Sequence, residues 1–118
     1  MISIETFRQF ALSLPEADEQ PHFDKTSFRV KNKIFATLNK AENRGTLRFS
    51  LENQDVFTII SKGAIFPVPN KWGKYGWTNI DLTIAGWELC QDAIRSAWCC
   101  VAPHKLLVQH PELNFDAE

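Results

Sequence analysis

Two segments with helical periodicity enclose a longer middle part in which apolar and polar residues alternate. Apolar side chains recur at helical spacing in residues 3–14 and again in residues 86–101, so each segment predicts an amphipathic helix. Ser3 can cap the first helix, and Pro15 ends it. Because alternation is typical of strands, this order predicts a small α+β domain. The apolar helix positions are Ile4, Phe7, Phe10, Ala11 and Leu14, then Trp87, Cys90, Ile94, Ala97, Trp98 and Val101.

The alternating middle part predicts four strands. Residues 26–31 and 33–39 form the first two, joined by a turn at Asn32 and Lys33, because Asn tolerates positive φ. The third strand has Leu47, Phe49 and Leu51 on its apolar face, and the fourth spans residues 77–83. The outward-facing residues of these strands include Arg29, Lys31, Lys33 and Arg48. The exposed face of the sheet is therefore expected to be basic.

The connecting segments are less regular. Residues 52–62 indicate a short helix, but four of the five residues from Val56 to Ile60 are β-branched, so a strand is the alternative. For the other connections we expect a polar, acidic loop over 15–24, an extended piece over 64–68, a loop over 70–76 and a short final helix over 104–109.

Length and composition indicate an ordinary globular protein. With 118 residues the chain is expected to form a single domain spanning 1–118, large enough to fold without a disulfide or a metal. No run approaches the roughly 20 apolar residues that a membrane helix needs, and the N-terminus does not resemble a signal peptide. The three cysteines are expected to be reduced thiols, and the protein is expected to be cytoplasmic and monomeric, with no membrane partner.

The charges are unevenly distributed along the chain. Residues 25–78 hold ten Lys or Arg and three Asp or Glu, a balance of +7, whereas the two ends together have a balance of −8. The total of −1 hides this separation. A basic middle part indicates an anionic partner.

The segment from Lys71 to Leu82 carries two of the four Trp, the only Tyr, two Lys and two of the five Gly. Cations can neutralise phosphates, and the rings of Trp72, Tyr75 and Trp77 can stack on bases. The alternative is that the cations only solvate a sheet face and that Trp77 belongs to the core.

No residue pattern specifies a catalytic or metal site. His22, His104 and His110 lack the spacing and the partner ligands of a zinc site. The carboxylates of residues 16–24 are most simply solvated, and Cys99-Cys100, at the negative end of a helix dipole, is expected to be buried and unreactive. We therefore expect a protein that is not an enzyme and that uses no cofactor and no metal.

The chain resembles the MmcQ/YjbR family over nearly its whole length. Several short pieces carry the resemblance through their order and spacing: Leu14-Pro15, Pro21-His22-Phe23, Ser27-Phe28-Arg29-Val30, Lys33-Ile34-Phe35-Ala36, Trp72-Gly73-x-x-Gly76-Trp77 before Asp81-Leu82, Ser96-Ala97-Trp98, and Val101-Ala102-Pro103-His104-Lys105-Leu106. One departure is His104, which stands where the family usually has Lys or Arg.

The resemblance implies an antiparallel β-sheet packed on one face by N-terminal and C-terminal helices, similar to the frataxin-like (CyaY-like) fold. It also implies a "double wing" arrangement and DNA binding, which fold similarity alone does not establish. Our leading hypothesis is a non-catalytic DNA-binding protein. The alternative is a protein-interaction or small-ligand-binding domain. The candidate DNA-contacting residues are Arg29, Lys31, Lys33, Arg48, Lys71, Trp72, Lys74, Tyr75, Trp77 and Lys105.

Overall fold

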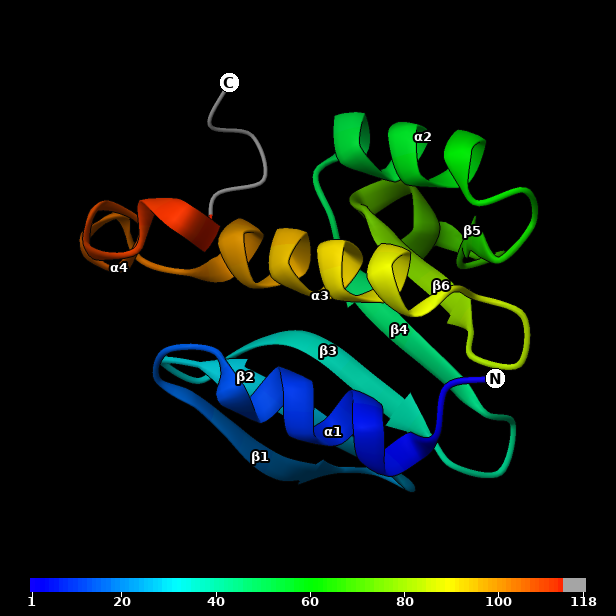
Figure 1. Cartoon of the computed structure of the whole chain (residues 1–118), viewed down its shortest axis with the longest axis horizontal. Coiled ribbons are helices and arrows are strands. Elements are labelled where there is room, and N and C mark those ends of the chain that lie inside the picture. The colour runs from blue at the N-terminus through cyan, green and yellow to red at the C-terminus, as the bar shows by residue number, and fades with distance from the viewer. Residues whose placement is uncertain (114–118) are drawn as a thin grey trace.

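The computed structural model describes residues 1–113 and has an α+β architecture (Figure 1). Six antiparallel strands form one sheet in the order β1-β2-β3-β4-β6-β5. The elements are α1 (Ile4–Ser13), β1 (Ala17–His22), β2 (Lys25–Val30), β3 (Lys33–Asn39), β4 (Arg44–Arg48), α2 (Leu51–Ile60), β5 (Ile65–Pro67), the 3-10 helix η1 (Lys71–Tyr75), β6 (Trp77–Asp81), α3 (Trp87–Val101), α4 (His104–Gln109) and the 3-10 helix η2 (Pro111–Leu113).

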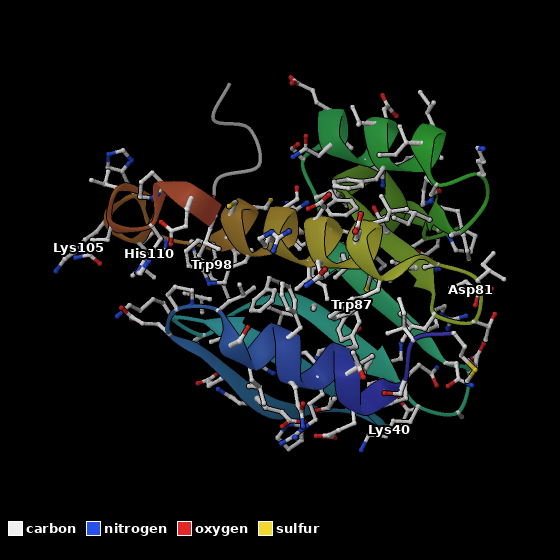
Figure 2. The ribbon with its side chains drawn as sticks, in the orientation of Figure 1. Lys40, Asp81, Trp87, Trp98, Lys105 and His110 are labelled. Atoms are coloured by element: carbon white, nitrogen blue, oxygen red, sulfur yellow. The ribbon has the colours of Figure 1, made fainter. Side chains whose placement is uncertain are left out.

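Helices α1 and α3 lie side by side on one face of the sheet (Figure 1). The ring of Phe10 on α1 meets the edge of Trp87 on α3 at 5.5 Å between centroids. At the other end of α3, Trp98 Nε1 donates a hydrogen bond of 3.0 Å to the carbonyl oxygen of Pro15, so the buried indole has a partner (Figure 2). The N-terminal and C-terminal helices therefore share one core with the sheet, as predicted.

Residues 51–60 form a helix despite their β-branched residues. Ser50 caps α2, because its Oγ accepts a hydrogen bond of 3.1 Å from the backbone N–H of Asn53. Phe57 on this helix stacks against Phe49 at 4.9 Å between ring centroids. The cap and this buried ring outweigh the intrinsic β-propensity of the segment.

The expected helices and the positions of the expected strands are confirmed, except that Leu51, predicted on the third strand, begins α2 and is exposed. The loop predicted over 15–24 is wrong. Residues 17–22 form β1, an edge strand that pairs with β2 across a hairpin turn at Phe23 and Asp24. Pro21 fits an edge strand, where one side of the backbone needs no partner. Strand β1 packs few of its side chains into the core, so polar residues suit it. Its sequence therefore lacks the apolar alternation from which a strand is predicted.

Two turns also differ from expectation. The β2–β3 turn is centred on Lys31 and Asn32, whose φ values are 50° and 68°, one residue earlier than predicted. Positive φ at both central residues is the geometry of a two-residue hairpin turn. Residues 71–75 are not an irregular loop but one 3-10 helix, capped by Asn70, whose Oδ1 accepts from the N–H of Trp72 at 2.9 Å.

Candidate functional site

The sheet face opposite α1 and α3 is the open face, and strand alternation decides which side chains it carries. Phe28, Leu38 and Leu47 point into the core, whereas the neighbours of each in sequence point to the open face. Register then aligns these neighbours across strands: Ser27 with Thr37 and Thr46 with Asn79. The open-face residues are Asp18, Gln20 and His22 on β1, Lys25, Ser27 and Arg29 on β2, Ile34, Thr37 and Asn39 on β3, Arg44, Thr46 and Arg48 on β4, Phe66 on β5, and Trp77, Asn79 and Asp81 on β6.

A hollow of 770 Å³, here called the sheet groove, crosses this face from β2 to β5. Its walls come from the β1–β2 hairpin, four strands, and the segment that leads into η1. The lining residues are His22, Phe23, Lys25, Ile34, Thr37, Arg44, Thr46, Phe66, Val68, Pro69, Asn70, Trp72, Trp77 and Asn79.

The floor of the sheet groove is polar. Thr37, Thr46 and Asn79 stand side by side on neighbouring strands, and Thr46 Oγ1 donates a hydrogen bond of 2.9 Å to Asn79 Oδ1. Thr37 and Asn79 are only 7% and 6% exposed although no helix covers them. Hydroxyl and amide groups in such a shielded position can form hydrogen bonds with a ligand that have little competition from water.

Aromatic side chains from distant segments meet around the groove. Phe23 lies at the tip of the β1–β2 hairpin, Phe66 lies on β5, Trp72 lies on η1, and Trp77 begins β6. Phe23 is 94% exposed and Trp72 is 52% exposed. Flat rings on a groove wall can stack on a planar ligand.

A second hollow of 490 Å³, here called the cation hollow, adjoins the sheet groove. Ile34 and Trp77 line both, and the cation hollow is also lined by Cys100 and Val101 from the last turn of α3, so it lies where the sheet meets the end of that helix. Strand register brings Arg29 opposite Ile34 and Arg48 opposite Trp77. The lining residues are Arg29, Asn32, Lys33, Ile34, Arg48, Trp77, Cys100 and Val101.

Arg48 connects the cation hollow with η1. Its Nη1 donates to the carbonyl oxygen of Phe49 at 3.0 Å and to that of Tyr75, while its guanidinium lies 5.8 Å from the centroid of the Trp77 ring. An arginine over an indole face gains cation–π energy and keeps the ring orientation fixed. Arg48 is therefore a cation on the surface and a support for η1 and Trp77.

Helix η1 carries its side chains as one cluster. The rings of Trp72 and Tyr75 meet edge to face with 6.1 Å between their centroids, and Lys71 Nζ lies 5.5 Å from the centroid of the Trp72 ring. The backbone depends on glycines here, because a Cβ on Gly73 would lie 2.0 Å from the carbonyl oxygen of Val68. Lys74 and Tyr75 are exposed on the same helix.

The two hollows carry positive charge. Among the described residues that line them are Lys25, Arg29, Lys33, Arg44 and Arg48, and none of those lining residues is Asp or Glu. Arg44 pairs with Glu42 at 2.9 Å. Within the described part of the chain, no carboxylate forms an ion pair with the other four cations.

The structure brings together some of the sequence-predicted candidates and separates others. Arg29, Lys33, Arg48 and Trp77 line the cation hollow, Trp72 lines the sheet groove, and Lys71, Lys74 and Tyr75 lie beside Trp72 on η1. Lys31 lies in the β2–β3 turn, where it pairs with Glu16 at 2.7 Å. Lys105 belongs to α4 at the end of the molecule opposite Asp81 (Figure 2). Neither Lys31 nor Lys105 lines a hollow.

Sequence reasoning missed Lys25, Arg44, Phe23 and Phe66 as groove residues. Alternation along β2 and β4 could have indicated the two cations, because Lys25 stands four residues before Arg29 and Arg44 stands four residues before Arg48. No local pattern indicates the two phenylalanines, since their position depends on the order in which distant strands pair.

The groups with shifted pKa values lie outside both hollows. The hydroxyl and the backbone N–H of Thr83 donate to Asp81 and lower the pKa of its carboxyl group, and burial raises the pKa of the Cys90 thiol to about 12. Hydrogen bonds to Glu19 and Glu5 raise the pKa of Arg8 on α1. Among residues 1–113, no three His, Cys, Asp or Glu side chains are grouped to hold a metal ion, and no helix is long and apolar enough to cross a membrane.

These features define a class: an α+β domain with helices on one face of its sheet and a basic, aromatic-lined groove on the other. The sequence model of the YjbR family matches residues 12–100, and the chain belongs to this family. The crystal structure of Deinococcus radiodurans protein DR2400, with a DUF419 domain, is similar in fold, with a TM-score of 0.75 and 20% sequence identity over 96% of this chain and 88% of that one. No curated protein matches the chain significantly.

Proposed function

We propose that this protein binds DNA through the open face of its sheet, as a monomer and without catalysing a reaction. One observation carries the proposal: the two adjoining hollows combine five cations with aromatic rings, and their described lining residues include no carboxylate. Cations gathered on one face attract a polyanion even when the net charge of the protein is −1.

The arrangement of the cations suits a phosphate backbone. Arg29, Lys33 and Arg48 border the cation hollow, and Lys71 and Lys74 extend the positive charge along η1. Each phosphate neutralised by Lys or Arg releases counterions, so such binding weakens as salt rises. The double-wing arrangement that the family resemblance implies agrees with a DNA-contacting role, and projecting hairpins such as β1–β2 are the elements it would use.

The absence of catalysis is part of the proposal, and the groove lining supports it. His22 lines the sheet groove, but neither Glu19 nor Asp24 is among its lining residues. A general acid or base usually needs a partner group that orients it and adjusts its pKa. Within the described lining of the groove, His22 has an aromatic neighbour instead, since its ring meets Phe23 at 4.8 Å between centroids.

The test is a titration of tryptophan fluorescence with double-stranded and single-stranded DNA at low and moderate salt. We expect micromolar or tighter binding at low salt that weakens steeply with salt. The double variant Lys71→Glu/Lys74→Glu should bind more weakly and show a flatter salt dependence. Lys40→Glu/Lys62→Glu changes the net charge equally, but these two lysines neither belong to η1 nor line a hollow, so this variant should retain binding. Undetectable binding of the wild type at low salt would refute the proposal.

A second function is favoured by the size of the sheet groove. Its volume of 770 Å³ falls in the range of about 300–1,000 Å³ that is common for small-ligand sites. Exposed Trp72 and Tyr75 also suit a protein partner, because Trp and Tyr are frequent at interface hot spots. Salt separates the two functions: an apolar anchor keeps its affinity as salt rises, whereas phosphate binding does not.

A further inference from the structure

We propose that the sheet groove binds single-stranded DNA in preference to duplex DNA, with unpaired bases stacked on its aromatic rings and with Phe23 as one of the stacking side chains. This inference rests on the proposed function and specifies which form of DNA the open face takes. Neither the family match nor the similar crystal structure indicates a strand preference or a role for Phe23.

Phe23 is the most unusual side chain of the groove. It is 94% exposed, and its backbone has φ of 58°, a conformation that bulky residues rarely adopt. Neither solvent exposure nor positive φ stabilises a phenylalanine, and Asn or Gly would suit the hairpin tip better. Strain of this kind is concentrated at functional sites. The edge-to-face contact with His22 holds the ring at the rim of the groove.

The other rings stand across the groove from Phe23. Phe66 lies on β5, whereas Phe23 lies beside β2, and four strand spacings separate β2 from β5 in the sheet. At about 4.8 Å per spacing the groove spans roughly 19 Å along the sheet. Stacked bases repeat at about 3.4 Å, so about five nucleotides fit between the two rims.

Ring stacking requires free base faces. In a duplex every base face is covered by the neighbouring base pair, and only the edges and the phosphates are accessible. The rings of Phe23, Phe66 and Trp72 can therefore stack only on unpaired bases. The floor residues Thr37 and Asn79 offer polar groups to base edges, while Lys25 and Arg44 lie where a backbone would pass.

The experiment measures fluorescence anisotropy of a labelled oligothymidylate of about 12 nucleotides and of a duplex of equal length at low salt. We expect the single strand to bind at least about tenfold more tightly than the duplex. Phe23→Ala should weaken single-strand binding about 5- to 150-fold, which corresponds to the about 1–3 kcal/mol of one stacked base, and should leave duplex binding nearly unchanged. Phe23→Trp keeps a ring and should retain the affinity.

The matched control is Ile59→Ala, which removes another highly exposed apolar side chain, 77% exposed, from α2, outside the groove. It should bind as the wild type does. Equal affinity for duplex and single strand, or an unchanged affinity of Phe23→Ala, would overturn the inference while leaving DNA binding itself intact. If neither DNA form binds, both the inference and the proposed function fail. Displacement of the oligonucleotide by thymidine monophosphate at equal nucleotide concentration would also overturn the inference, because it assigns the groove to small ligands.

Discussion

Gln54 Nε2 donates a hydrogen bond of 2.8 Å to the carbonyl oxygen of Gly73, and this contact attaches η1 to helix α2. The same amide nitrogen lies 3.0 Å from Thr78 Oγ1 on β6. Gln54 is buried, so one side chain of α2 fixes the positions of the η1 backbone and the start of β6. The aromatic wall of the sheet groove therefore depends on a polar contact inside the protein.

Replacing Gln54 with Leu should destabilise the fold and loosen η1. The change removes the buried hydrogen bonds from Gln54 to the Gly73 carbonyl and to Thr78 Oγ1, each worth about 0.5–1.5 kcal/mol, while the carbonyl keeps its bond from the N–H of Gly76. Urea unfolding should report this loss, and hydrogen exchange should report faster opening of residues 71–77. Gln109→Leu, on the exposed surface of α4, is the control and should stay within about 0.5 kcal/mol of the wild type. Equal stabilities of the two variants would contradict the role assigned to Gln54.

Gly76→Ala should be among the most damaging single changes. Gly76 has φ of 103°, and a Cβ there would lie 1.9 Å from the carbonyl oxygen of Phe49. Both the strain and the backbone clash oppose any side chain, so we expect a loss of about 3 kcal/mol or more.

The control for this change is Gly86→Ala, because a Cβ at Gly86 meets nothing within 4 Å and its φ is −76°. Because Gly is preferred to Ala at an N-cap, this change should cost about 1 kcal/mol, well below the loss expected at Gly76. Thermal unfolding of both variants measures the difference. A Gly76→Ala protein as stable as Gly86→Ala would show that the backbone at η1 can move without cost.

The helices and most strands could be predicted because their apolar side chains follow the periods of helix and strand. Strand β1 could not, because an edge strand needs only hydrogen bonds from β2 and no apolar face of its own. The expectation that Cys99 and Cys100 are buried was wrong for Cys100, which is exposed at the last turn of α3, while Cys99 is half-buried. Helical periodicity places Cys100 away from the core face that Trp98 occupies.

The candidate site was predictable where its residues are contiguous in sequence or follow strand alternation, as Arg29, Lys33 and Arg48 do. The cluster of Lys71, Trp72 and Tyr75 is contiguous in sequence, so its chemistry is visible there. The sheet groove joins Phe23 to Phe66, which are far apart in the chain. Strand order brings them to one surface, and it is a property of long-range pairing that no local pattern contains.

Asp81 should make the stability depend on pH in the acid range. Thr83 donates to its carboxylate from Oγ1 at 2.6 Å and from the backbone at 2.9 Å, which lowers the pKa below the ordinary value of 3.8. The unfolded state therefore binds more protons in this range, so the stabilisation is present above pH 4 and is lost as pH falls through the lower, folded-state pKa.

Asp81→Asn keeps the shape of the side chain but removes its titration. At pH 7 the variant should be less stable by up to about 1 kcal/mol, since the carboxylate is largely solvated. The difference should shrink as pH falls below about 4. Urea unfolding of both proteins between pH 2 and pH 7 measures it, and a constant difference over that range would disprove the assigned titration.

The three thiols should differ in reactivity. Burial raises the pKa of Cys90 to about 12, so almost no thiolate is present at pH 8 and no reagent reaches it. Cys100 is exposed and should react first with a colorimetric disulfide reagent. Cys100→Ser should remove the fast phase, and labelling of Cys90 should require denaturant. Mass spectrometry of briefly treated native protein checks the order, and early modification of Cys90 would contradict its burial.

Neutralising Lys33 and neutralising Lys31 are matched substitutions that test the proposed DNA surface. Lys31 pairs with Glu16 outside both hollows, whereas Lys33 lines the cation hollow beside Arg48. Lys33→Gln should weaken single-stranded DNA binding and reduce the slope of log affinity against log salt by about 0.7, the loss of one phosphate contact. Lys31→Gln should leave that slope unchanged and alter stability by less than about 1 kcal/mol, because its ion pair is exposed. The measurement is anisotropy at several salt concentrations. Equal slopes for the two variants would mean that Lys33 makes no contact of its own with the phosphate backbone.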